Sequence, residues 1–408
     1  MIKFDTDQVN HVNHLYPHMK PKITIIGIGG AGGNMLQAVF DAKITPLTLV
    51  ALNTDFQALE TLNIPKKLVL GASLTSGMGT GANPEVGKIA VEENIEEIVS
   101  IVSDSDIVFL LGGLGGGTGS SVLPVIARIL QEKQILSVAL VTKPFFFEGA
   151  RRMQVAQAAL QKIEEIVDTH IVIPNQKLFD SGDLENISLV DAFSKINTVV
   201  VGCIKAVTET IFFPGHINVD FADIKTTMTR MGKAVMGVGK GIGEKRAFEA
   251  IQAALACPLL EHNSLKGARS ILLNIHGDKS LSLQEMNIIA TYVHDEVHPD
   301  AHIIVGNSLK SNSEENSVTL TIIATGFEDQ LKSRLQNKAA INYSPQGYYP
   351  NTQTNNNFKT GVQQAMASSF HHGQSFSEKN PEVQRFTDNS AKNLDIPTFF
   401  RNQNLAEK

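Results

Sequence analysis

The chain has 408 residues, with 35 basic and 41 acidic side chains and a formal net charge of −6. This acidic balance argues against a general nucleic-acid binder, which carries a basic patch or stripe. Hydrophobic residues make up 42% and charged residues 19%, the proportions of a globular protein. No run approaches the roughly 18 consecutive apolar residues of a membrane span. The two cysteines, Cys203 and Cys257, form no disulfide framework, which favours a reducing cytosol.

Residues 1–20 are polar and mixed, so we predict a flexible N-terminal tail. Residues 21–187 alternate short apolar runs with helical patterns, which is typical of a parallel sheet covered by helices on both faces. The strands expected in this first domain lie at 22–29, 48–53, 67–71, 106–113, 136–144 and 169–175.

A long helix is predicted over residues 188–213, where apolar side chains recur every three or four positions. The stripe that we expect to be buried comprises Leu189, Phe193, Ile196, Val200, Cys203, Val207 and Ile211. Residues 214–328 are predicted to form a smaller α+β domain. In this domain, helix-like segments precede strands at 270–277, 302–308 and 318–326.

The composition changes again toward the C-terminus. Residues 329–390 are rich in Asn, Gln, Ser and Thr and cannot bury enough apolar surface to offset the entropy of ordering, so we predict a disordered linker. Residues 391–408 become apolar again in the stretch LDIPTFFRNQN. Ile396, Phe399 and Phe400 have the spacing of anchors that enter a partner's groove, so this end is predicted to be a partner-binding peptide.

Three glycine-rich turns follow strands of the first domain. They are GIGGAGGN at 27–34, TSGMGTGANPEVG at 75–87 and LLGGLGGGTGS at 110–120. Glycine lets the backbone approach a phosphate closely, and a helix N-terminus after such a turn favours an anion. The carboxyl ends of parallel strands meet at one edge of the sheet, where ligands bind. We therefore expect the three turns to surround a nucleoside di- or triphosphate.

Two other interpretations of these turns stay open on the residues alone. Gly27, Gly29 and Gly32 match the GxGxxG pattern, and Asp55 follows the second strand, so an NAD(P)-dependent oxidoreductase is a competitor. A glycine turn can also serve only to pack a helix tightly on a sheet. An ordinary P-loop is excluded, because its lysine is missing from LGGLGGGTGS.

Histidines form two sets with helix-face spacing, but no metal site is predicted from them. Pro17 interrupts the first set and Pro299 the second, which breaks the helical face that such a site requires. The two sets are His11, His14 and His18, and His294, His298 and His302.

The motifs together resemble those of the tubulin/FtsZ superfamily, and most closely those of the bacterial cell-division GTPases of the FtsZ family. GGLGGGTGS is similar to the tubulin signature loop, and the other similar stretches are GIGGAGGN, ALNTDFQAL, GANPEVG, VTKPFFFEGARR, IPNQKLF, DAF and NVDFAD. The resemblance runs in order over residues 22–326 and resumes in LDIPTFFRNQ. It implies a tubulin-like α/β fold with a Rossmann-type parallel-sheet GTPase domain, a long central helix, a smaller α+β C-terminal domain and a disordered tail.

The resemblance also implies which residues bind GTP and GDP. Glu148 and Arg152 match a pair that contacts the ribose, although an i, i+4 ion pair is by itself usually a solvated helix face. Asn175 and Asp191 match residues that read guanine, although Asp191 would also suit a helix cap. The residues that match the phosphate loops are Gly30, Ala31, Gly32, Gly33, Asn34, Gly117, Thr118 and Gly119.

A predicted catalytic loop, 214–224, contains NVDFAD with Asn218, Asp220 and Asp223. By resemblance this loop enters the nucleotide site of the next subunit, where its carboxylates orient the attacking water. GTP hydrolysis would then depend on head-to-tail polymerisation. Mg²⁺ is expected to bind through phosphate oxygens and water, with no assigned protein ligand. A non-hydrolysing paralogue with a structural role is the remaining alternative.

The expected partners are further copies of the chain and membrane-anchored division adaptors such as FtsA-like proteins, which the segment Asp395–Arg401 would bind. Neither nucleic acid nor direct membrane insertion is expected, and the predicted location is the cytoplasm at the mid-cell division site. The chain departs from the family pattern at Ala31, Thr80 and Ser121. We expect Ser121, which stands in place of a glycine, to tighten the fit around phosphate.

Overall fold

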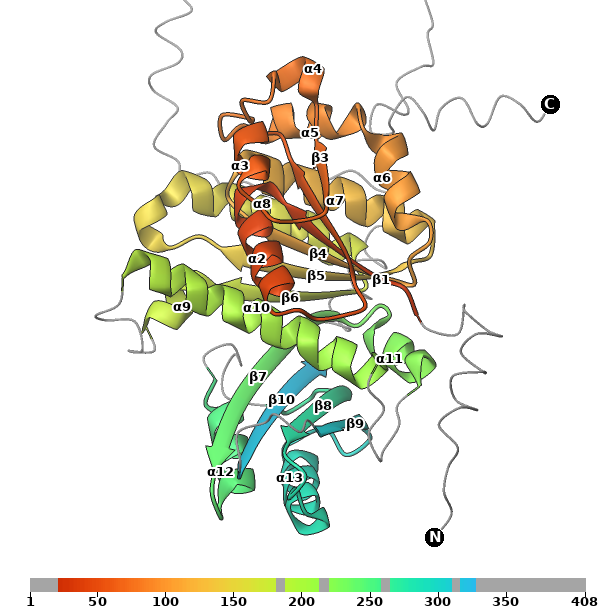
Figure 1. The fold of residues 1–408 in the computed structure, drawn as a ribbon, viewed down its shortest axis with the longest axis vertical. Helices are drawn as coiled ribbons and strands as arrows, with labels where there is room; N and C mark the ends of the chain where they lie inside the picture. Colours follow the sequence, from red (N-terminus) through yellow and green to blue (C-terminus); the bar gives the residue numbers. More distant parts are fainter. Residues whose placement is uncertain (1–20, 181–187, 213–219, 258–264, 310–315, 328–408) are drawn as a thin grey trace, which may run out of the picture. The chain divides into compact units, whose positions relative to one another are not determined.

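The computed structural model describes residues 21–180, 188–212, 220–257, 265–309 and 316–327. These residues form a ten-stranded sheet in the order β3-β2-β1-β4-β5-β6-β7-β10-β8-β9 (Figure 1). Several predictions concern segments outside the described residues. They are the tail 1–20, Asn218 and most of the catalytic loop, the linker 329–390 and the peptide 391–408 with Asp395–Arg401.

The first six strands pair in parallel, as the alternating pattern predicts. Each inner strand is buried on both faces, which explains its nearly unbroken apolar sequence. Ile23 and Ile25 of β1 face one core cluster, whereas Ile26 and Ile28 face the other. The strands are β1 (Ile23–Ile28), β2 (Thr48–Asn53), β3 (Lys66–Val69), β4 (Ile107–Gly113), β5 (Leu136–Lys143) and β6 (Thr169–Pro174).

Helices cover both faces of these parallel strands. α2 packs on β1, β2 and β4, while α7 and α8 belong to the second core cluster on the other face. The helices of this half are α2 (Gly29–Asp41), α3 (Phe56–Glu60), α4 (Ala72–Thr75), α5 (Pro84–Glu92), α6 (Ile95–Val102), α7 (Gly117–Glu132), the short 3₁₀ helix η1 (Phe146–Glu148), α8 (Ala150–Ile166) and α9 (Asn175–Asp180).

The predicted long helix is α10 (Leu189–Phe212), which packs on α2 and on the second half of the sheet (Figure 1). Its middle turns are buried as expected, at Ile196, Val200, Cys203 and Val207. The stripe does not continue to the N-terminal end, where Leu189 is 58% and Phe193 41% exposed. Phe193 is exposed because it lines a cavity. Its ring makes an edge contact with the ring of Phe145, with 5.6 Å between the centroids.

The second half of the sheet contains one strand that the sequence pattern missed. Residues 232–242 fall in the region where helix-like segments were expected, but they form β7 (Gly232–Ile242). Gly239 and Gly241 lie so close to α12 that a Cβ there would collide with the carbonyl oxygens of Ala250 and Arg246. Glycine thus allows the close packing and removes the apolar alternation that marks a strand. The other elements are α11 (Phe221–Met228), α12 (Arg246–Leu255), β8 (Ser270–Gly277), α13 (Leu283–Glu296), β9 (His302–Leu309) and β10 (Ser317–Thr325).

The two halves join through a short pairing of β6 with β7. It spans three residue pairs, from Thr169 with Gly232 to Ile171 with Ala234. Beyond this join, β10 pairs antiparallel with β7 and β8, and β9 lies parallel to β8 at the edge. Within the described ranges, no helix is both long enough and apolar enough to cross a bilayer.

Candidate functional site

A cavity of about 370 Å³ opens where β1, β4, β5 and β6 end. These strands are parallel, so the cavity lies at the carboxyl edge of the sheet, where open α/β folds bind ligands. α10 closes the other side with its N-terminal third. The lining from the strand ends and α10 includes Ile28, Gly113, Thr142, Asn175, Phe193, Ile196 and Asn197.

Two helix N-termini meet at the cavity. α2 begins at Gly29, directly after β1, and α7 begins at Gly117, directly after the β4 turn. Gly29 has φ +71°, and a Cβ there would lie 3.2 Å from the nitrogen of Gly119, so the two turns touch. Unpaired N–H groups and the positive ends of two helix dipoles therefore face the same space, which suits a polyanion.

The glycines of the first turn divide between two roles. Gly30, Ala31 and Asn34 line the cavity, whereas Gly32 and Gly33 do not. A Cβ on Gly32 would collide with the carbonyl oxygen of Leu111, and one on Gly33 would lie 3.0 Å from Leu62. Gly32 and Gly33 thus allow α2 to pack closely on the rest of the domain.

The signature loop contributes Gly117, Thr118 and Gly119 to the lining. Ser121 does not face the cavity, because its Oγ donates to the carbonyl of Gly117 at 2.7 Å. The same hydroxyl packs against Gly87 of α5, where a Cβ would collide with it. The expectation that Ser121 tightens the fit around phosphate therefore finds no contact in this structure.

The third glycine-rich turn, 75–87, supports the signature loop from behind and supplies no cavity-lining residue. Thr80 lies against Gly117 so closely that any Cβ at position 117 would collide with its hydroxyl. Asn83 accepts a hydrogen bond from the N–H of Glu85 at 3.0 Å and so caps α5. Two of the three predicted turns line the cavity, and the third holds one of them in place.

Glu148 and Arg152 both line the cavity and bind each other. Arg152 Nη1 lies 2.6 Å from Glu148 Oε2, and Glu148 Oε1 accepts the N–H of Phe145 at 2.9 Å. Glu148 comes from η1 and Arg152 from the first turn of α8, with Gly149 at φ +95° between them. The carboxylate is thereby held by two partners, and the half-exposed guanidinium extends beside the opening.

Asn175 is 4% exposed, and within the described residues its Oδ1 has no hydrogen-bond partner. An unsatisfied buried acceptor is costly, and a ligand with N–H donors would satisfy it.

Asp191 does not line the cavity: it is exposed and accepts a hydrogen bond from Ser188 at 2.6 Å. Asn197, which the motif comparison missed, lines the cavity in its place. Its spacing of one helical turn from Phe193 is the signal that places both on one face.

The two described aspartates of the predicted catalytic loop lie away from the cavity. Asp220 is the N-cap residue of α11 and Asp223 lies in its first turn, and both are exposed. Neither carboxylate has a partner among the described residues, and Asp220 does not use its side chain as a cap. At the other end of α11, the carbonyl of Met228 accepts the hydroxyl of Thr169, the first residue of β6. α11 is therefore anchored at the amino edge of the sheet, opposite the cavity.

No group of three or more His, Cys, Asp or Glu side chains that could hold a metal ion occurs in the part of the chain that the structure describes. Within the described part of the chain, Glu148 supplies the carboxylate of the cavity lining, and it is already paired with Arg152. A cation that accompanies a polyanionic ligand here would therefore be held mainly by the ligand's own oxygens and water.

Comparisons with known proteins agree with this geometry. Residues 22–183 match the family model "Tubulin/FtsZ family, GTPase domain", and residues 232–328 match "FtsZ family, C-terminal domain". A Wolbachia protein named "Cell division protein FtsZ" is 44% identical over 324 residues, which cover 76% of this chain and 81% of that protein. The protein of the same name from Magnetospirillum gryphiswaldense is 41% identical, but the match spans only 55% of its length.

A solved structure, "FtsZ dimer, empty (M. jannaschii)", has a similar fold. It is 38% identical, with a TM-score of 0.73, and the match covers 80% of this chain and 94% of that one. The nicotinamide oxidoreductase considered above gains no support from these matches. With the matched domains in the predicted order on one mixed sheet, this chain belongs to the FtsZ family of cell-division proteins, and residues 22–183 are its GTPase domain.

Proposed function

We propose that the protein binds GTP in the cavity and hydrolyses it within head-to-tail filaments, as part of bacterial cell division. The observation on which the proposal rests is the separation of two half-sites. The cavity lies at the carboxyl edge of the sheet. Asp220 and Asp223, whose carboxylates have no partner among the described residues, lie on a helix anchored at the amino edge. One subunit cannot bring them together, but two subunits stacked along the same direction can.

The nucleotide fits the cavity in one orientation. Its phosphates take the N-termini of α2 and α7, where Gly30 and Thr118 lie, because these present N–H donors to an anion. The base takes the α10 side, where Asn175 and Asn197 offer amide groups to the guanine edge and Phe193 offers a ring to stack on. Asn197 thereby replaces Asp191 as the proposed second reader of guanine.

Hydrolysis needs a water oriented for attack in line with the leaving phosphate, and phosphoryl transfer depends mainly on positioning and charge stabilisation. Among the described residues that line the cavity, the carboxylate is that of Glu148, which is held by Arg152 and by the N–H of Phe145. We assign the orienting role to Asp220 and Asp223 of the neighbouring subunit, together with Asn218, which lies outside the described residues. A Mg²⁺ ion bound with the nucleotide would neutralise phosphate charge, and it would be held by phosphate oxygens and water rather than by an assigned protein ligand.

In the cell, this activity would belong to cytoplasmic filaments at the division site. The segment Asp395–Arg401 is proposed to attach them to membrane-anchored adaptors such as FtsA-like proteins. This segment lies outside the described residues.

A mixing experiment tests the shared site. Asp220→Ala removes the donated carboxylate, and Gly30→Asp places a negative charge in the phosphate site at a position where a Cβ meets no atom within 4 Å. Each variant alone should release no phosphate from GTP. In an equal mixture about a quarter of the interfaces pair an intact cavity with an intact loop, so activity should recover to at most that fraction of wild type.

Two controls make the result decisive. Gly30→Asn, which has the same shape without the charge, should stay active. Sedimentation should show that the two variants assemble together. Co-assembly without recovered activity would rule out the shared site, and so would an active Asp220→Ala variant by itself. Wild-type filaments that form with GTP and release no phosphate at any protein concentration would instead indicate the non-hydrolysing paralogue.

A further inference from the structure

A buried pair of hydroxyl groups connects the phosphate side of the cavity to the end of β2. Thr118 of the signature loop lines the cavity, and its Oγ1 lies 2.8 Å from Oγ1 of Thr54. Thr54 is 0% exposed and does not itself line the cavity. The side-chain contact through which Thr54 can act on a ligand is therefore the one with Thr118.

Each hydroxyl has one proton, so one member of the pair donates and the other accepts. If Thr118 donates to Thr54, its proton is used and only lone pairs face the cavity. If Thr54 donates, the proton of Thr118 is free to point at a ligand. Phosphate oxygens only accept hydrogen bonds, so a bound phosphate selects the second arrangement.

Thr54 is held firmly enough to act in this way. Its carbonyl accepts the N–H of Gly79 at 3.1 Å. The next residue, Asp55, forms a β-bridge with Met78. Thr54 is thus fixed between the end of β2 and the turn that supports the signature loop, and its hydroxyl has a defined direction toward Thr118.

We infer that Thr54 is a positioning residue of the phosphate site: it donates to Thr118 and so commits the Thr118 proton to a phosphate of the bound nucleotide. The inference rests on the proposed function, because it requires a phosphate ligand in the cavity. The competing view is that the pair only fastens α7 to the end of β2.

The matched variants are Thr54→Val, which keeps the shape and removes the hydroxyl, and Thr54→Ser, which keeps the hydroxyl. Equilibrium binding of GTPγS, a slowly hydrolysed GTP analogue, is measured at concentrations below assembly. Thr54→Val leaves Thr118 its own proton but removes the donor that orients it, so Kd should rise about three- to tenfold, the size expected for one neutral hydrogen bond. Thr54→Ser should restore Kd to within about twofold of wild type.

A double-mutant cycle separates positioning from fastening. Thr118→Val removes the hydroxyl through which Thr54 acts, so adding Thr54→Val to it should change Kd no further. If Thr54 only fastens the helix, Thr54→Val lowers the thermal midpoint of the nucleotide-free protein. It then raises Kd by the same factor in the wild-type background and in the Thr118→Val background. That outcome, or unchanged binding by Thr54→Val, overturns the inference while leaving GTP binding intact. A wild-type protein that fails to bind GTPγS would instead overturn the proposed function.

Discussion

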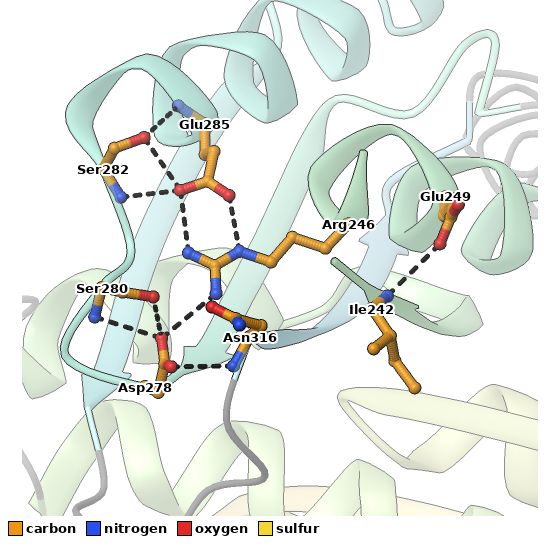
Figure 2. A network of polar contacts seen from close by, with 8 residues as sticks. All are labelled: Ile242, Arg246, Glu249, Asp278, Ser280, Ser282, Glu285 and Asn316. Carbon is orange, nitrogen blue, oxygen red and sulfur yellow. Dashed lines mark hydrogen bonds and ion pairs between the residues drawn. The ribbon is translucent and has the colours of Figure 1, made fainter. Parts of the chain in front are cut away.

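Arg246 is the structural residue whose removal should affect folding most clearly. Its guanidinium lies between two carboxylates in the second half of the sheet (Figure 2). Nε and Nη2 bind the two oxygens of Glu285 at 2.6 and 3.1 Å, and Nη1 binds Asp278 at 3.2 Å. The Arg246 side chain is 5% exposed and comes from α12, whereas Glu285 lies in α13. The network therefore ties two helices and the β8 turn together.

We expect Arg246→Met, which keeps the apolar stem, to leave two carboxylates facing each other without their cation. Removing one partner of a buried ion pair costs about 3–5 kcal/mol. Both carboxylates here remain 17% exposed, so water can partly replace the guanidinium. The expected loss is at the low end of the range, about 3 kcal/mol of unfolding free energy at pH 7.

The loss should depend on pH in a defined direction. Hydrogen bonding from Arg246 is the main reason that the pKa of Glu285 falls from 4.5 to about 2. A carboxyl with a lowered folded-state pKa stabilises the protein above its unfolded pKa, and this contribution disappears as the pH falls toward the folded value. The difference between wild type and Arg246→Met should therefore be full above pH 5 and shrink between about pH 4.5 and 2. Asp278 differs, because Ser280 contributes most to lowering its pKa to about 2.

Urea unfolding followed by circular dichroism measures the effect. With a slope of about 3 kcal/mol per M, the upper part of the usual range for urea, the midpoint should fall by about 1 M. Glu249→Gln is the control, because Glu249 makes only an exposed hydrogen bond to the N–H of Ile242 in the same region (Figure 2). An unchanged midpoint for Arg246→Met, or a difference from wild type that stays constant from pH 7 to pH 3, would refute the reasoning.

Three further predictions concern packing, base recognition and thiol burial. Gly239→Ala should cost about 3 kcal/mol in thermal unfolding because its Cβ collides with α12, whereas Gly202→Ala, whose Cβ would make an ordinary 3.5 Å contact with Met236, should gain up to about 1 kcal/mol. Asn197→Ala should raise the Kd for GTP about three- to tenfold and Asp191→Ala should not; the reverse order would restore Asp191 as the base reader. Burial raises the pKa of the Cys203 thiol, so a thiol reagent should label Cys257 first and Cys203 only on unfolding; equal rates in the native protein would contradict this.

The strands could be predicted from the sequence wherever both of their faces are buried. β1 and β4 show nearly unbroken apolar runs because they are buried along almost their whole length. β7 could not be predicted in this way, because the glycines that allow α12 to pack closely on it interrupt the alternation of apolar and polar residues that indicates a strand. A similar difference arises in α10. The recurrence of apolar residues every three or four positions predicted a buried stripe along the whole helix, but this pattern does not show that the first turns line a cavity.

The candidate site was predictable where its residues are contiguous and not where the fold assembles it from separate segments. The turns that contain Gly30 and Gly117 are contiguous glycine-rich motifs, which can be recognised in the sequence. Asn197 and Thr54 have no motif, and their relation to the cavity depends on how α10 and β2 pack. The motif comparison instead named Asp191, which lies near Asn197 in sequence but on another face of the helix.

The two edges of a parallel sheet explain why such a site would be divided between subunits. At the carboxyl edge, α2 and α7 start beside the cavity and their dipoles attract phosphate. Asp220 and Asp223 lie instead at the start of α11, which is anchored at the amino edge. Carboxylates built permanently into the cavity would repel the nucleotide and weaken its binding. In the proposed mechanism, one strand length, about 20 Å for six residues, would keep the anions apart until assembly joined the edges. Nucleotide binding and hydrolysis can then be separate events.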